Sequence, residues 1–141
     1  STGTADVALL LAREMPSASV LGIDPSDKML ELGRAKVHQQ ELDAQIVLEQ
    51  HDARDLSRLL TEQHSSLQLF DAATMAFGIR NVPEKDIALC EIHRLLKDKS
   101  PFCILEFAEP DESAGVLGAM ARVFIRHVVP FLGAILVSTR R

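Results

Sequence analysis

Short apolar runs alternate along this chain with stretches of helical periodicity, and this alternation restricts the fold more than any other feature. The apolar runs are predicted strands over 19–23, 45–49, 70–75 and 102–107. The helical stretches are predicted helices after Ser26 and over 5–15, 56–64, 84–96 and 113–136. Because parallel strands require crossover helices, the pattern predicts an α/β fold with a doubly wound, mostly parallel sheet.

Two expectations about the core follow from the same pattern. The first predicted helix carries Val7, Leu10 and Leu11 on one face, which we expect to pack on the sheet. Cys90 falls in a predicted helix and Cys103 in a predicted strand, so we expect both thiols to lie in the core.

The composition is that of one globular domain, and we assign residues 1–141 to it. The chain has 141 residues, of which 47% are hydrophobic and 25% charged. A net charge of -5 provides no basic stripe, so we expect no nucleic-acid partner. The two cysteines and five histidines show no ligand spacing, so we expect no metal site and no disulfide framework.

Ligands of doubly wound folds bind beyond the carboxyl ends of the strands, so the residues that follow each strand are the candidates. The opening loop holds Gly3 and Thr4, whose small size permits close backbone approach. Asp24 ends a strand twenty residues after Thr4 and suits ribose hydroxyls, although a helix-capping or solvated carboxylate remains open. Asp52, with Ala53, suits an adenine amino group, and a loop carboxylate that caps the next helix is the alternative.

These positions together indicate an adenosine cofactor, and the opening loop discriminates between the candidates. A dinucleotide site requires glycines where this chain has Ala5 and Ala8. The Asp6 carboxylate at the helix N-terminus would also repel a pyrophosphate. S-adenosylmethionine carries a cationic ammonium and sulfonium instead, so the sequence favours a methyl donor over NAD.

Several segments resemble known methyltransferases. Gly3-Thr4-Ala5-Asp6 resembles the G-T-G-D motif of class I methyltransferases. More specific are FGIRNV at 77–82, EIHRLLK at 91–97, LEF at 105–107 and HVVPFLG at 127–133. These are similar to the UbiE-type C-methyltransferases of ubiquinone and menaquinone biosynthesis. The resemblance covers nearly the whole chain, but Ala5 stands where a glycine is usual and residues 97–101 replace a KPGG turn.

The resemblance implies a Rossmann-like class I methyltransferase fold that lacks its first strand and its C-terminal strands in this chain. We therefore expect 1–141 to be a partial domain, the middle of a longer protein. The implied cofactor is S-adenosylmethionine, and its implied binding residues are Gly3, Thr4, Asp24, Asp52, Ala53 and Ala76. Thr4 contacts the methionine part, Asp24 the ribose, and Asp52 with Ala53 the adenine. The family often has Ser at the position of Ala76. An alanine lacks the hydroxyl, so the implied contact of Ala76 with the cofactor is through its backbone.

The implied substrate is a prenylated quinol that is methylated on a ring carbon. Arg80 is the predicted catalytic residue because a guanidinium, although a poor base, stabilises a phenolate. Asn81 is predicted to orient the same oxygen. The competing interpretation of Arg80 is a loop arginine that pairs with a nearby acid. Two other functions remain open, namely an inactive methyltransferase-like scaffold subunit and a class I methyltransferase for another small molecule.

The last predicted helix, 113–136, is strongly apolar. It suits packing over the sheet or between subunits of a homodimer or biosynthetic complex. It equally suits a lid for a prenyl tail with peripheral membrane contact. We expect a bacterial protein in the cytoplasm or on the inner-membrane face, and a eukaryotic one in the mitochondrial matrix or inner membrane.

Overall fold

The computed structural model describes residues 1–56, 59, 69–107, 115–124 and 127. The chain forms two compact units, 1–106 and 107–141, and each is described by itself. The assignment of 1–141 to a single domain stays a prediction.

The helices and strands follow the predicted order. They are α1 (Asp6–Glu14), β1 (Val20–Asp24), α2 (Asp27–Gln39), β2 (Ile46–Gln50), β3 (Ala73–Ala76), the 3-10 helix η2 (Ile79–Asn81), α3 (Lys85–Leu95), β4 (Phe102–Leu105) and α4 (Gly115–Val123). The strand predicted from Phe70 begins at Ala73, because Phe70 forms only an isolated bridge with Leu96. Most of the predicted helix over 56–64, and most of the last predicted helix after Phe124, lie outside the described residues.

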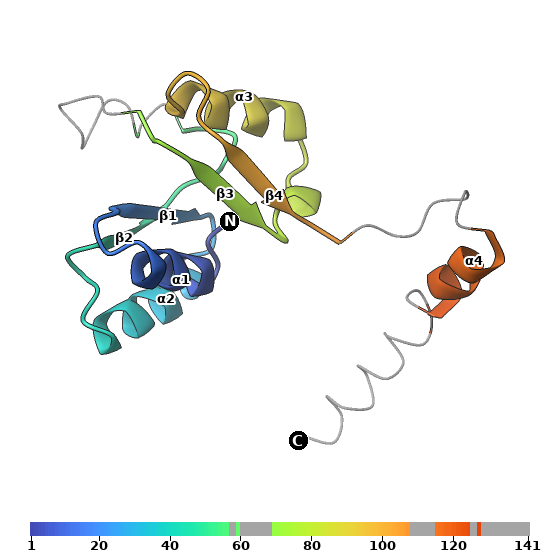
Figure 1. Cartoon of the computed structure of the whole chain (residues 1–141), viewed down its shortest axis with the longest axis horizontal. Helices are drawn as coiled ribbons and strands as arrows, with labels where there is room; N and C mark the ends of the chain where they lie inside the picture. Colours follow the sequence, from blue (N-terminus) through green and yellow to red (C-terminus); the bar gives the residue numbers. More distant parts are fainter. Residues whose placement is uncertain (57–58, 60–68, 108–114, 125–126, 128–141) are drawn as a thin grey trace. The chain divides into compact units, whose positions relative to one another are not determined.

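The strands form two parallel pairs, each joined by a crossover helix (Figure 1). β1 pairs with β2 from Val20↔Ile46 to Asp24↔Gln50, and α2 connects them. β3 pairs with β4 from Ala73↔Phe102 to Ala76↔Leu105, and α3 connects them. The prediction of parallel strands with helical crossovers is therefore confirmed.

A first cluster of buried side chains joins α1 and α2 to β2. Along α1 the buried residues are Ala8, Leu9 and Ala12. The predicted inward face of α1 was wrong, since Leu10 is 56% exposed and Val7 is also exposed. Two of these three buried residues are alanines, whose small side chains permit close packing of a helix on strands.

A second cluster packs α3 against β3 and the loop after β2. Alternate residues of β1 point to opposite faces, so that Val20 packs on the first cluster and Leu21 on the second. Helices thus cover both faces of the strands, as a doubly wound sheet requires. The prediction of buried thiols was wrong, because Cys90 and Cys103 are both exposed. Cys90 lies off the inward face of α3, and the part of β4 that holds Cys103 is exposed.

The second unit contains α4, an apolar helix with exposed side chains. Val116, Leu117, Met120 and Val123 are each more than half exposed. Among the residues that the structure describes, no helix has both the length and the hydropathy to cross a lipid bilayer.

Candidate cofactor and substrate site

The opening loop runs alongside the end of β1 and turns into α1. The Thr2 amide donates to the Ile23 carbonyl over 2.8 Å. Gly3 and Ala5 both take left-handed backbone conformations, with φ of +55° and +66°. A left-handed glycine is unstrained, whereas a left-handed alanine costs roughly 1–2 kcal/mol. The position of Ala5 therefore has the conformation for which the resembled motif uses glycine.

Asp24, at the end of β1, holds this loop in place. Its Oδ2 accepts the Gly3 amide at 2.8 Å, and its Oδ1 accepts the Ser26 amide at 3.0 Å. The residue is only 8% exposed. The carboxylate thus joins the opening loop to the start of α2. Each oxygen retains acceptor capacity, because a carboxylate oxygen accepts more than one hydrogen bond.

Thr4 and Asp6 form a polar cluster with Lys36 of α2. The Thr4 hydroxyl donates to Asp6 Oδ2 at 2.7 Å, and Lys36 Nζ donates to Thr4 Oγ1 at 2.9 Å and to Asp6 Oδ1 at 2.7 Å. The hydrogen bond from Lys36 is the main cause that holds the pKa of Asp6 below its usual value. Asp6 thus forms an ion pair with Lys36 and stays ionised at the start of α1; the predicted repulsion of a pyrophosphate stays a prediction.

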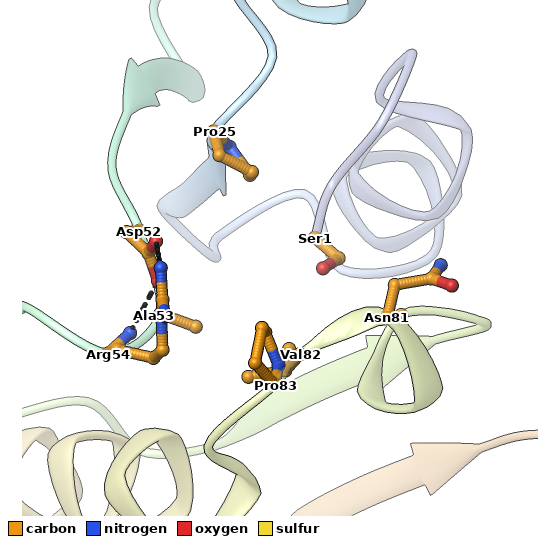
Figure 2. Close-up of a pocket in the computed structure, with 9 residues that line it drawn as sticks. Ser1, Pro25, Asp52, Ala53, Arg54, Asn81, Val82 and Pro83 are labelled. Carbon is orange, nitrogen blue, oxygen red and sulfur yellow. Dashed lines mark hydrogen bonds and ion pairs between the residues drawn. The ribbon is translucent and has the colours of Figure 1, made fainter.

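An open cavity of about 190 Å³ lies at the carboxyl ends of β1 and β2. Its lining consists of Ser1, Pro25, Asp52, Ala53, Arg54, Gly78, Asn81, Val82 and Pro83. Figure 2 shows the segment from Asp52 to Arg54 on one side and Val82 with Pro83 facing it. Three predicted site residues, Asp52, Ala53 and Asn81, therefore meet at one cavity.

The other predicted residues lie near this cavity but outside its described lining. Gly3, Thr4 and Asp24 are linked to it through the opening loop that begins at Ser1. A Cβ on Gly78 would come within 2.5 Å of the Ser1 side chain, so the loop after β3 approaches the opening loop closely. Ala76 ends β3, opposite Leu105.

Asp52 is bound by Arg54, two residues further along the chain. Oδ1 accepts the Arg54 amide at 2.9 Å and Nε at 3.0 Å, and Oδ2 accepts Nη2 at 2.7 Å. The side-chain hydrogen bonds from Arg54 are the main cause that lowers the pKa of Asp52 from 3.8 to about 2. The carboxylate therefore stays ionised at physiological pH and keeps its role as an acceptor.

Arg80, in η2, pairs with Glu106 after β4. Its amide donates to Glu106 Oε2 at 3.4 Å, and its Nε lies 3.5 Å from Oε1. The Arg80 side chain is 53% exposed, whereas that of Glu106 is 17% exposed. The pairing that the sequence analysis named as the competing interpretation is thus present, and it orients the guanidinium without burying it.

Arg54 and the wall made by Val82 and Pro83 were not among the site residues predicted from the sequence. Both lay next to recognised residues, since Arg54 follows Asp52 and Ala53, and the wall follows Asn81. A basic residue two positions after a carboxylate that follows a strand was the available signal for Arg54.

The chemistry of this lining fits the adenosine part of S-adenosylmethionine. Ala53, Pro25 and Pro83 offer apolar surface to a base. Asp52 offers an ionised acceptor to an exocyclic amino group, and Asn81 adds an amide.

Comparisons with known proteins show the family of this chain and its fold. Residues 1–140 match the sequence profile of the ubiE/COQ5 methyltransferase family. A demethylmenaquinone methyltransferase from Porphyromonas gingivalis is 36% identical over 137 residues, which cover 96% of this chain and 52% of that protein. The ubiquinone/menaquinone biosynthesis C-methyltransferase UbiE of Geobacter sp. (strain M21) is 38% identical over 134 residues, covering 94% of this chain and 53% of that protein.

Among solved structures, the [4+2]-cyclase SpnF superposes with a TM-score of 0.69 at 23% identity, over 80% of this chain and 39% of that one. This likeness concerns the fold alone. Together with the family match, it confirms the predicted Rossmann-like class I methyltransferase fold. The chain spans about half the length of the two relatives described above.

Proposed function

The chain belongs to the ubiE/COQ5 methyltransferase family, and from this premise we propose that the protein methylates a ring carbon of a prenylated quinol with S-adenosylmethionine. The pathway is that of ubiquinone or menaquinone, which the names of two relatives support. The observation that carries the proposal is the cavity lined by Asp52 and Ala53 together with three residues of the FGIRNV segment, Gly78, Asn81 and Val82.

For the cofactor, we propose that Asp52 and Ala53 bind the adenine and that Asp24 shares its remaining acceptor capacity with the ribose. Gly3 and Thr4 bind the methionine part, and Ala76 contributes through its backbone. The order of these residues along the carboxyl ends of the strands supports the assignment. S-adenosylmethionine supplies an electrophilic methyl group when bound.

On the substrate side, we propose Arg80 as the catalytic residue and Asn81 as its partner. The ring becomes a carbon nucleophile when its phenolic oxygen loses a proton. The Arg80 guanidinium stabilises the resulting phenolate and so lowers the pKa of the phenol. Glu106 supports this role because it accepts the Arg80 amide and its carboxylate forms an ion pair with the Arg80 guanidinium. The phenolic proton passes to water, and after methyl transfer the proton on the ring carbon does the same, so that aromaticity returns.

Methyl transfer by the full-length protein tests this role of Arg80. We expect Arg80→Ala to lower the rate about 100-fold, since loss of one such stabilising donor costs roughly 10²–10³. Cofactor affinity should change less than about twofold. The remaining activity should rise with pH, because an unassisted phenol ionises near its ordinary pKa of about 10. Arg13→Ala, on α1, is the control; full activity in Arg80→Ala would refute the assignment.

Calorimetry with S-adenosylmethionine separates the enzyme from an inert scaffold. We expect binding by the wild-type full-length protein and weaker binding by Asp24→Asn and Asp52→Asn. Binding without methyl transfer to demethoxy-ubiquinol or demethyl-menaquinol analogues would indicate a methyltransferase for another small molecule.

We also propose that α4 contacts the prenyl tail or the lipid surface that holds it. The exposed Val116, Leu117 and Met120 support this contact. In liposome sedimentation, Leu117→Glu should reduce the bound fraction, and absence of wild-type binding at low and moderate salt would exclude the membrane contact.

A further inference from the structure

Arg54 contributes two different ion pairs at the edge of the cavity. On one side, its Nε and Nη2 form the two-pronged contact with Asp52. On the other side, its Nη1 lies 2.5 Å from Oε2 of Glu84. A guanidinium is planar and presents its donors in a fixed fork, so one arginine can orient two carboxylates at once. Both acids raise the pKa of Arg54, and Asp52 contributes most.

The two carboxylates come from opposite walls of the cavity. Asp52 belongs to the wall that follows β2, whereas Glu84 comes directly after Pro83, which belongs to the wall that follows β3; Glu84 itself lies outside the described lining. Arg54 therefore bridges the segment proposed to bind the cofactor and the segment that carries Arg80 and Asn81.

The Glu84 side chain does not cap the helix that it precedes. It is the N-cap residue of α3, and in this described helix its carboxylate makes no capping hydrogen bond. Glutamate is not among the favoured N-cap residues, which are Ser, Thr, Asp and Asn. The carboxylate reaches Arg54 instead, so the contact across the cavity, rather than helix capping, accounts for its orientation.

We propose that Arg54 is a positioning residue that clamps the two walls of the cofactor cavity together through Asp52 and Glu84. The inference rests on the proposed function in that the clamped cavity is the one assigned to S-adenosylmethionine. The clamp fixes the Asp52 carboxylate for the adenine. It also couples cofactor binding to the segment 79–83, so that occupation of one wall orders the other.

Four variants of the full-length protein test the clamp by calorimetry with S-adenosylmethionine. We expect Arg54→Met to weaken binding about tenfold and Glu84→Gln about threefold, within the usual range for coupled charged groups. The double variant should bind like Arg54→Met alone, because both changes remove the same bridge. Arg34→Met is the matched control, since Arg34 pairs with Asp27 at similar exposure on α2 and lies outside the cavity lining.

Glu84→Ser separates the clamp from a merely structural role. Serine is a favoured N-cap residue and should preserve or raise the melting temperature. It cannot reach Arg54, so it should still weaken cofactor binding about threefold. Additive effects in the double variant, or unchanged affinity in both Arg54→Met and Glu84→Ser, would overturn the proposal.

Hydrogen exchange without cofactor gives a second readout that does not depend on the proposed function. With the clamp, Glu84→Ser should speed exchange of the Arg54 and Asp55 amides on the opposite wall, while the amides of β1 stay unchanged. Unchanged exchange at Arg54 and Asp55 would refute the clamp. Absence of cofactor binding in the wild type, with altered exchange in the variant, would refute the proposed function alone.

Discussion

Two residues in this chain adopt a left-handed conformation where the resembled motifs use glycine. Ala5 has φ +66° and Lys99 has φ +63°. Their surroundings differ, because Ala5 is fully buried in the first cluster whereas Lys99 is exposed. The buried methyl of Ala5 contributes roughly 0.8 kcal/mol, which offsets much of its strain.

We therefore expect Lys99→Gly to raise the free energy of unfolding by about 0.5–1 kcal/mol. Ala5→Gly should change it by less than about 1 kcal/mol, because relief of strain is balanced by lost burial and added chain entropy. Urea unfolding measures both. A clear destabilisation by Lys99→Gly would contradict the strain assigned to this turn, and Asp98→Gly controls for chain entropy.

The lowered pKa of Asp52 gives stability a dependence on pH. The pKa is 3.8 in the ordinary state and about 2 in the folded chain. The pair with Arg54 therefore stabilises the fold above about pH 4 and loses this effect as the pH falls toward 2. Asp52→Asn should destabilise the protein near pH 6 and match the wild type near pH 2. A difference that is constant across this range would exclude the ion pair as its source.

At the scale of single residues, the hydrogen-bond acceptors of the site were predictable from the sequence, but the donors that bind them were not. Asp24 and Asp52 were recognisable because Asp24 ends β1 and Asp52 comes two residues after the end of β2. Their hydrogen-bond donors were not, since the Gly3 amide reaches Asp24 only after the opening loop turns back along β1.

Among the elements, α1 shows how packing can override a count of large apolar side chains. The sequence pattern favoured Val7, Leu10 and Leu11, whereas the helix buries Ala8, Leu9 and Ala12. The order and type of the described elements were predictable from periodicity. The face of α1 was not, because it depends on how closely the helix approaches the strands.

A matched pair of leucine variants tests this face. Leu9 is 5% exposed and Leu10 is 56% exposed. Leu9→Ala should cost about 2–5 kcal/mol in unfolding free energy, and Leu10→Ala less than about 0.5 kcal/mol. Denaturant titration measures both, and equal losses would mean that Leu10 is covered in solution.

In the first unit, the two buried clusters meet at β1, whose alternate residues belong to one or the other. Parallel pairing within each strand pair was predictable from the crossover helices. The division into two clusters was not, because it depends on which helices cover each face of β1.

This division predicts different local stability in the two halves of the unit. Leu30→Ala removes a fully buried side chain of the first cluster and should cost about 2–5 kcal/mol. Hydrogen exchange should then speed up more in β1 and β2 than in β3 and β4. Leu95→Ala, in the second cluster, should produce the reverse pattern. Equal acceleration in both halves would show that they unfold as one cooperative unit.

The two backbone amides that Asp24 accepts have a further consequence for ligand affinity. They immobilise the carboxylate in the folded chain, so its rotamer entropy is lost on folding rather than on association. Ordering a side chain upon binding costs about 0.5–1.5 kcal/mol, which corresponds to about a two- to tenfold change in dissociation constant. Asp24 is therefore a preorganised acceptor, and a ribose that binds it does not bear the cost of ordering this side chain.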